Sequence, residues 1–259
     1  MNWRFPDGCH PVGSVHVTDP LAPLLELPGV EQAVAAAREA VDAVHAHPAN
    51  RRGWPATAAE ASVRAARASA ALDGGAADIP ATGEVTDPHL AGALRIGESI
   101  GPILKVWQRA PMQALARLHV LAAADLVDDD ALGRPRAARW ISKRLDILAE
   151  IVAGGTSVPG PVLTAVVHGE LLALSPFDSA NGVVARAAAR LSMIATGLDP
   201  KGLIVPEVFY LRRSDRYAAA AAAFAKGGDG LTEWLLFSCE AIEAGAREAT
   251  SIAEAALPA

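Results

Sequence analysis

Two absences narrow the class of this 259-residue chain before any motif is considered. Cysteine occurs only at Cys9 and Cys239. A disulfide framework and a cysteine zinc site are therefore excluded, and a reduced, cytoplasmic interior is expected. Long uncharged apolar runs are also missing, and the opening MNWRFPDGCHP has no stretch typical of a signal peptide. We expect a cytoplasmic protein without a membrane-spanning segment.

An excess of positive charge is absent as well. The chain carries 23 lysines and arginines against 29 aspartates and glutamates, for a formal net charge of −6. We therefore expect no nucleic-acid partner, since binding to phosphate backbones needs a basic surface. The histidines at 10, 16, 45 and 47 lack carboxylate or cysteine neighbours at ligand spacing, and the acidic run 128–130 lacks the alternating ligands of a calcium loop. No metal site is predicted.

Aromatic residues make up only 5% of the chain although hydrophobic residues make up 51%, and alanine-rich segments of this kind favour helices. We predict an all-α fold with one domain, residues 30–259, preceded by an extended arm, residues 1–29, that packs through its leucines at 21, 24, 25 and 27. A capping box, Thr57 to Glu60, and the pair Asp87–Pro88 predict two helix starts. The predicted helices cover about 30–47, 57–73, 88–108, 111–125, 136–152, 161–174, 181–196, 214–226 and 231–256, with Gly101–Pro102 kinking or dividing the third.

The centre of the sequence is a loop between two helices, in the run SPFDSANGVVARAAAR (175–190). Pro176 ends an apolar helix, and Asp178 and Ser179 are residues that cap helices, so a second helix is expected to open out of this loop. Free backbone N–H groups and the helix dipole make such an N-terminus an anion site. Arg186 and Arg190 lie one turn apart on one face and are expected to add positive charge.

This run resembles the core motif of the Fic (filamentation induced by cAMP) family, H-P-F-x-D/E-G-N-G-R-x-x-R. Five positions agree with the motif: Pro176, Phe177, Asn181, Gly182 and Arg186. Four positions that carry its chemistry differ, with Ser175 at the histidine, Ser179 at the acidic residue, Ala180 at the first glycine and Val183 at the first arginine. The resemblance extends over most of residues 58–248 and implies a Fic-like helical bundle.

In the Fic family the histidine is the general base for a target hydroxyl, the acidic residue holds magnesium, and the Asn-Gly loop with the arginines cradles nucleotide phosphates. The resemblance therefore implies a phosphate- or nucleotide-binding loop that has lost its base and its metal ligand. ATP or another nucleotide is the implied ligand, and magnesium is not expected because Ser179 replaces the acidic residue. The implied binding residues are Pro176, Phe177, Ala180, Asn181, Gly182 and Arg186.

Other side chains near the loop were considered for the missing base. His168 precedes Ser175 by about two helical turns, roughly 10 Å, and is too far away to replace it. Glu170 and Asp178 are the nearest carboxylates, and Asp178 is also an alternative metal ligand, although helix or loop capping is the preferred interpretation of Asp178 and Ser179. No residue is assigned a confident catalytic role.

The upstream run SAALDG, Ser69 to Gly74, resembles the family's inhibitory motif, S/T-x-x-x-E-G/N, with Asp73 in place of the glutamate. In relatives the glutamate pairs with the second arginine of the core motif, here Arg186, and blocks the nucleotide's last phosphate. Ser69, Asp73 and Gly74 are therefore candidate autoinhibitory residues, while local pattern alone makes Asp73 an ordinary helix C-cap. The family's flap hairpin is expected to be reduced or absent, because residues 136–152 are helical in pattern.

Three functional hypotheses follow from the sequence. The first is a degenerate Fic-domain protein, or pseudoenzyme, that binds nucleotide but has weak or absent protein AMP-transferase (AMPylation) activity. The second is an active transferase with an altered donor or chemistry. The third is a non-catalytic interaction module, which predicts that Val183 and Arg186 are buried in a filled site. A target protein and the oligomeric state stay open at this point.

Overall fold

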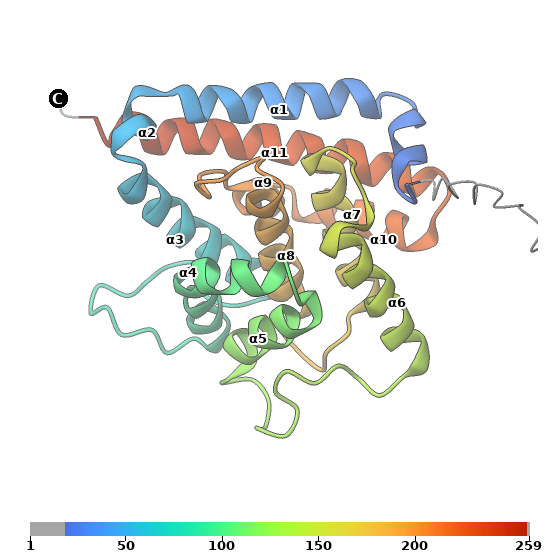
Figure 1. The fold of residues 1–259 in the computed structure, drawn as a ribbon. Helices are drawn as coiled ribbons and strands as arrows, with labels where there is room; N and C mark the ends of the chain where they lie inside the picture. Colours follow the sequence, from blue (N-terminus) through green and yellow to red (C-terminus); the bar gives the residue numbers. More distant parts are fainter. Residues whose placement is uncertain (1–18, 258–259) are drawn as a thin grey trace, which may run out of the picture.

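The computed structural model describes residues 19–257, which form eleven α-helices and no β-strand (Figure 1). The all-α prediction is confirmed, and no flap hairpin is present in these residues. Cys9, His10, His16 and residues 1–18 of the predicted arm lie outside the described range. The helices are α1 (Val30–Ala46), α2 (Pro48–Arg52), α3 (Trp54–Leu72), α4 (Pro88–Trp107), α5 (Pro111–Ala123), α6 (Arg139–Glu150), α7 (Gly160–Leu174), α8 (Asn181–Ala195), α9 (Pro206–Arg212), α10 (Ser214–Lys226) and α11 (Asp229–Ala255).

The described end of the arm is not extended throughout. Ala22–Glu26 form a short 3-10 helix, and Leu21 is buried while the leucines at 24, 25 and 27 pack against the core. The carboxylate of Asp19 accepts hydrogen bonds from the backbone N–H of Ser157, at 2.6 Å, and the hydroxyl of Thr156, at 2.7 Å. The arm is therefore attached to the loop between α6 and α7, as well as through its leucines.

Two helix starts differ from prediction for local reasons. The helix α3 begins at Trp54 rather than at Thr57, whose hydroxyl donates to the Trp54 carbonyl and to Asn50 instead of capping a helix end. The helix α6 begins at Arg139 rather than 136, because the backbone N–H of Arg136 donates to the Pro176 carbonyl, at 2.7 Å. Arg136 thus belongs to a loop that lies against the central motif.

The predicted start of α4 is confirmed, since the Asp87 carboxylate accepts the backbone N–H of Leu90 at 2.8 Å. Gly101 and Pro102 do not divide this helix, which continues through both to Trp107. None of the helices in residues 19–257 has both the length and the apolar character needed to cross a bilayer.

The motif is carried by two helices at the middle of the bundle. Helix α7 is buried on nearly all sides, and it packs along α8, of which residues 183–193 are all buried. Around this pair lie α4 with α5, α3 with α9, and the long pair α1 and α11, which run side by side (Figure 1). A helix that is apolar all round is stable only when other helices cover it. The loop between α7 and α8 is therefore held on both sides by core packing.

Close packing of α4 on α5 predicts one sensitive glycine. A Cβ at Gly92 would lie 2.2 Å from the Ala122 carbonyl oxygen on α5, so backbone would have to move. Gly92→Ala is expected to destabilise the fold by about 1–3 kcal/mol and to lower the melting temperature by roughly 2–4 °C per kcal/mol. Gly101→Ala on the same helix meets no atom within 4 Å and serves as the control. Equal melting temperatures for the two variants would contradict this packing.

Candidate functional site: the loop between α7 and α8

The loop between α7 and α8 has two residues in the left-handed region, one at each end. Ser175, the C-cap of α7, has φ 42°, and Ala180, the N-cap of α8, has φ 53°. Glycine adopts this region at the lowest cost, so the structure gives a physical reason for a glycine at the motif position that Ala180 occupies. The side chain of Asn181 fixes the turn by accepting the N–H of Phe177, at 2.9 Å, and donating to its carbonyl, at 2.8 Å. The predicted loop followed by a helix N-terminus is confirmed.

Phe177 anchors the loop in the core. Its side chain is buried, and its ring stacks on the imidazole of His119 on α5, with centroids 4.1 Å apart. His119 Nδ1 accepts the backbone N–H of Gly133, at 2.9 Å, and burial lowers the pKa of His119. This neutral histidine joins the motif loop to the loop before α6. Sequence reasoning missed His119, because its position on a buried helix carries no motif signal.

The carboxylate of Asp73 lies at the N-terminus of α8. Arg186 Nη2 donates to Asp73 Oδ1 at 2.6 Å, and the backbone N–H of Val183 donates to Asp73 Oδ2 at 3.1 Å. A Cβ on Gly182 would come within 2.4 Å of Asp73 Oδ1, so only glycine permits this approach. Of the predicted binding residues, Arg186 and Gly182 therefore lie against a carboxylate of the chain itself.

Asp73 also supplies the cap that the sequence assigned to Asp178 and Ser179. That assignment is wrong: α8 has no cap bond from its own loop, Asp178 is exposed, and the Ser179 hydroxyl is buried without a partner. The cap comes instead from the end of α3, where Gly74 has φ 86° and lets the chain turn away after Asp73. A partner more than a hundred residues away leaves no local pattern for a capping prediction.

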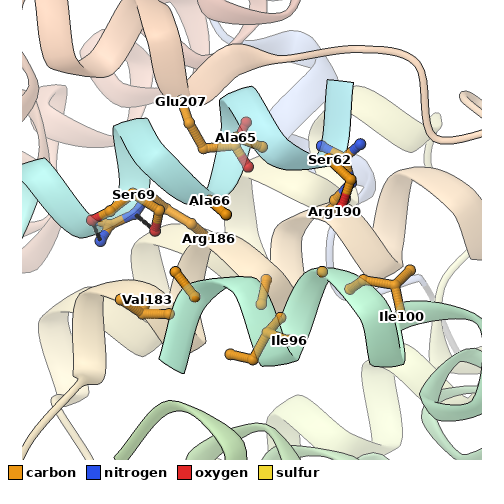
Figure 2. Close-up of a pocket in the computed structure, with 13 residues that line it drawn as sticks. Ser62, Ala65, Ala66, Ser69, Ile96, Ile100, Val183, Arg186, Arg190 and Glu207 are labelled. Carbon is orange, nitrogen blue, oxygen red and sulfur yellow. Dashed lines mark hydrogen bonds between the residues drawn. The ribbon is translucent and has the colours of Figure 1, made fainter. Parts of the chain in front are cut away.

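Arg186 is enclosed by acceptors. Its Nε donates to Ser69 Oγ at 2.8 Å and its Nη2 to the Ser69 carbonyl at 2.9 Å (Figure 2). Its Nη1 donates to the Tyr217 hydroxyl at 3.4 Å. Burial works to lower the pKa of Arg186, but Tyr217 and Asp73 outweigh it and the pKa is raised. The guanidinium is thus charged and almost fully engaged by α3 and α10.

Three of the residues considered as bases near the loop make bonds elsewhere, whereas the fourth, Asp178, is exposed. The Ser175 hydroxyl donates to the Leu172 carbonyl at 2.9 Å, back along its own helix. Glu170 forms a two-bond pair with Arg144, both distances being 2.6 Å. His168 is buried and shares a hydrogen bond of 2.8 Å with Tyr217. In this arrangement none of the three is free to accept a proton from a target.

Arg190 does not add charge to the anion site, contrary to the sequence prediction. Its guanidinium donates to the carbonyls of Gly202, at 2.5 Å, and Ile204, at 3.2 Å, and is buried there. Among residues 19–257, no cluster of three or more histidine, cysteine, aspartate or glutamate side chains has the arrangement of a metal site.

The space beside the loop is small. A cavity of about 30 Å³ lies between α3, α4 and α8, lined by Ser69, Val183 and Arg186 among others (Figure 2). Sites for drug-sized ligands measure roughly 300–1,000 Å³. Val183 and Arg186 are each only 3% exposed. In this conformation the region is therefore closed to a nucleotide.

The fold is that of known Fic proteins. A Fic family protein from Desulfovibrio desulfuricans G20 matches with a TM-score of 0.71 and 19% identity, over 86% of this chain and 74% of that one. A segment of Fic-1 from C. elegans matches with a TM-score of 0.69 and 15% identity, over 91% and 76% of the two chains. No family model and no curated protein matches the sequence. The chain thus has the Fic fold, which confirms the fold implied by the motif.

Burial of His168 predicts how stability depends on pH. Burial, with a smaller contribution from the charge of Arg186, lowers the pKa of His168 to about 3 from a usual 6.5. Between these values the unfolded chain binds a proton that the folded chain does not, so stability falls as pH falls through this window. His168→Gln removes this contribution, and the loss of stability between pH 6 and 4 should shrink by up to about 1.4 kcal/mol per pH unit. Urea unfolding at several pH values measures both slopes, and equal slopes would contradict a neutral buried His168.

Proposed function

We propose that this chain is a divergent Fic-family pseudoenzyme whose phosphate-binding loop is held closed by its own Asp73. The observation that carries the proposal is the pair of bonds to that carboxylate, one from Arg186 and one from the backbone N–H of Val183. Helix N-terminal N–H groups and a guanidinium are the groups that bind a phosphate oxygen. An internal anion already occupies this anion site.

Weak or absent AMP transfer follows from three of the four replaced motif positions, 175, 179 and 183. A serine hydroxyl at 175 is a poor base near neutral pH, and losing a general base costs about a hundred- to ten-thousandfold in rate. Ser179 offers no carboxylate to a magnesium ion, and Val183 is part of the apolar core. These replacements weaken or remove catalysis, and they leave Arg186 and the N-terminus of α8 as the remaining anion-binding groups.

A nucleotide can use the site only if Asp73 leaves it. Arg186 would then keep its bonds to Ser69 and Tyr217 and exchange one carboxylate for one phosphate. Because both anions make the same kind of bond, they compete directly. Nucleotide binding is therefore expected to be weak in the natural sequence and stronger when the carboxylate is removed.

Calorimetric titration with ATP, with and without magnesium, tests this competition. A hydrogen bond to a charged group contributes about 1.5–3 kcal/mol, so Asp73→Gly should bind ATP roughly 10- to 100-fold more tightly than the natural chain. Adding Arg186→Ala to Asp73→Gly should abolish the binding. Asp125→Gly is the matched control, because it removes the same charge just after the end of another helix, α5, where Asp125 pairs with Arg95. Equal affinity in Asp73→Gly and the natural chain would contradict the closed-loop proposal.

A second candidate function is a non-catalytic interaction module in which the loop serves only as packing. The burial of Val183 and Arg186 and the small cavity between α3, α4 and α8 favour it. It predicts that neither the natural chain nor Asp73→Gly binds ATP or inorganic phosphate. The titration thus separates the two functions, and binding that depends on Arg186 would exclude the second.

The Asp73→Gly variant, which lacks the carboxylate that closes the site, also tests whether catalysis is absent. Asp73→Gly, incubated with ATP, magnesium and a cell lysate, is expected to produce no AMP adduct on itself or on any other protein by mass spectrometry. The assay must detect AMP transfer that is a hundredfold or more slower than transfer by a site with a general base. An adduct that disappears in Asn181→Ala would instead support an active transferase with altered chemistry.

A further inference from the structure

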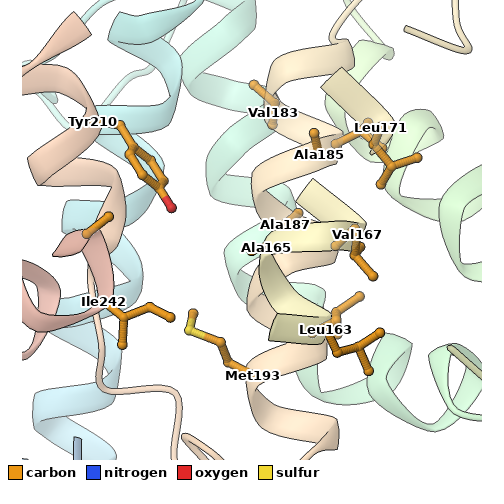
Figure 3. Close-up of a cluster of buried hydrophobic side chains, with 14 of the residues drawn as sticks. Leu163, Ala165, Val167, Leu171, Val183, Ala185, Ala187, Met193, Tyr210 and Ile242 are labelled. Carbon is orange, nitrogen blue, oxygen red and sulfur yellow. The ribbon is translucent and has the colours of Figure 1, made fainter. Parts of the chain in front are cut away.

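A second cavity lies behind the motif, between α7, α8, α9 and α11. Its volume is about 10 Å³, and it is lined by polar groups from three helices, Thr164, Glu207 and Ser238. Much of its remaining wall is apolar, including Ala165 and Met193, which Figure 3 shows on neighbouring central helices. The cavity adjoins the space beside Ser69 and Val183, because Arg186, Arg190 and Glu207 line both, whereas Thr164 and Ser238 line only this one.

Each of the three polar side chains presents an atom that lacks a hydrogen-bond partner in the protein. These atoms are Thr164 Oγ1, Glu207 Oε2 and Ser238 Oγ, and their residues are 5%, 5% and 3% exposed. Native proteins leave few buried polar atoms unsatisfied, because each one costs about 1–3 kcal/mol. Three such atoms at one cavity point to a common hydrogen-bonding partner.

The neighbouring cations do not satisfy the buried carboxylate. Arg190 lines the same cavity but donates to the carbonyls of Gly202 and Ile204. Arg186 also lines it, and its recorded bonds go to Ser69, Asp73 and Tyr217. Burial raises the pKa of Glu207, and the charges of Arg190 and Arg186 oppose this only in part. A donor that reaches the carboxylate would relieve this cost.

We propose that the cavity is a specific binding site for one internal water molecule, held by Thr164, Glu207 and Ser238. A volume of about 10 Å³ is close to the minimum for one water and excludes a larger ligand. A water supplies two donors and two acceptors, so it can donate to the carboxylate and bond to both hydroxyls. It would join α7, α9 and α11 behind α8, the helix that carries Arg186.

The thermal stability of two variants tests this site. If water bridges the side chains, Thr164→Val and Ser238→Ala each break one of its bonds, and each melting temperature should fall by about 2–4 °C. If the cavity is dry, each substitution only removes an unsatisfied hydroxyl, and the melting temperature should stay the same or rise. Ser192→Ala is the matched control, since Ser192 is also buried within a helix but its hydroxyl donates to the Ala188 carbonyl, at 2.9 Å.

A crystal structure of the natural chain, at a resolution that shows ordered water, gives the second readout. Electron density for one water within hydrogen-bond distance of Glu207 and both hydroxyls is expected. A cavity without such density, or a direct bond between two of the three side chains that closes it, would overturn the proposal. This readout also stands if a variant fails to fold. Because it does not involve nucleotide, its failure is distinct from failure of the proposed function.

Discussion

The ion pair between Asp73 and Arg186 determines the arrangement of the site. A guanidinium that is 3% exposed cannot be left without acceptors, because an unpaired buried charge costs several kcal/mol. Ser69 and Tyr217 supply neutral acceptors, and Asp73 supplies the compensating charge. The end of α3 must therefore lie against the start of α8, which fixes the position of the loop between α7 and α8.

The Asp73 carboxylate has a second role at the start of α8, where the first backbone N–H groups have no partner within the helix. Left uncapped in a buried region, these donors would weaken the helix. Asp73 accepts the N–H of Val183, so one side chain neutralises the arginine and caps the helix. Gly182 is required for this double role, because any larger side chain would meet the carboxylate. Gly182, one of the motif positions, thus makes room for an internal anion.

The fold could be predicted from the sequence because its signals were local and agreed with one another. Alanine-rich amphipathic segments, the Asp87 cap and the glycine after Asp73 each predicted a helix or its end, and the motif implied the Fic fold that structural comparison confirms. The errors came where distant segments compete with local pattern. The Thr57 hydroxyl bonds to Asn50 rather than capping a helix. Helix α8 is capped by Asp73, at the end of α3, and not by Asp178.

The residues of the candidate site could be predicted from the sequence, but the contact between Asp73 and Arg186 that closes it could not. Sequence could align Asp73 with an inhibitory position, but aspartate is one methylene shorter than glutamate, and only coordinates establish that it reaches Arg186. The contact with Val183 explains why the shorter side chain is adequate. It holds the carboxylate at the N-terminus of α8, beside Gly182. Replacement of the motif's first arginine by Val183 fits the same arrangement, since one carboxylate needs one guanidinium and a second buried cation would have no counter-charge. Aspartate at 73 carries the same charge as the motif's glutamate, so only the valine at 183 changes the charge at the site, and the Asp73 carboxylate is balanced by Arg186 alone.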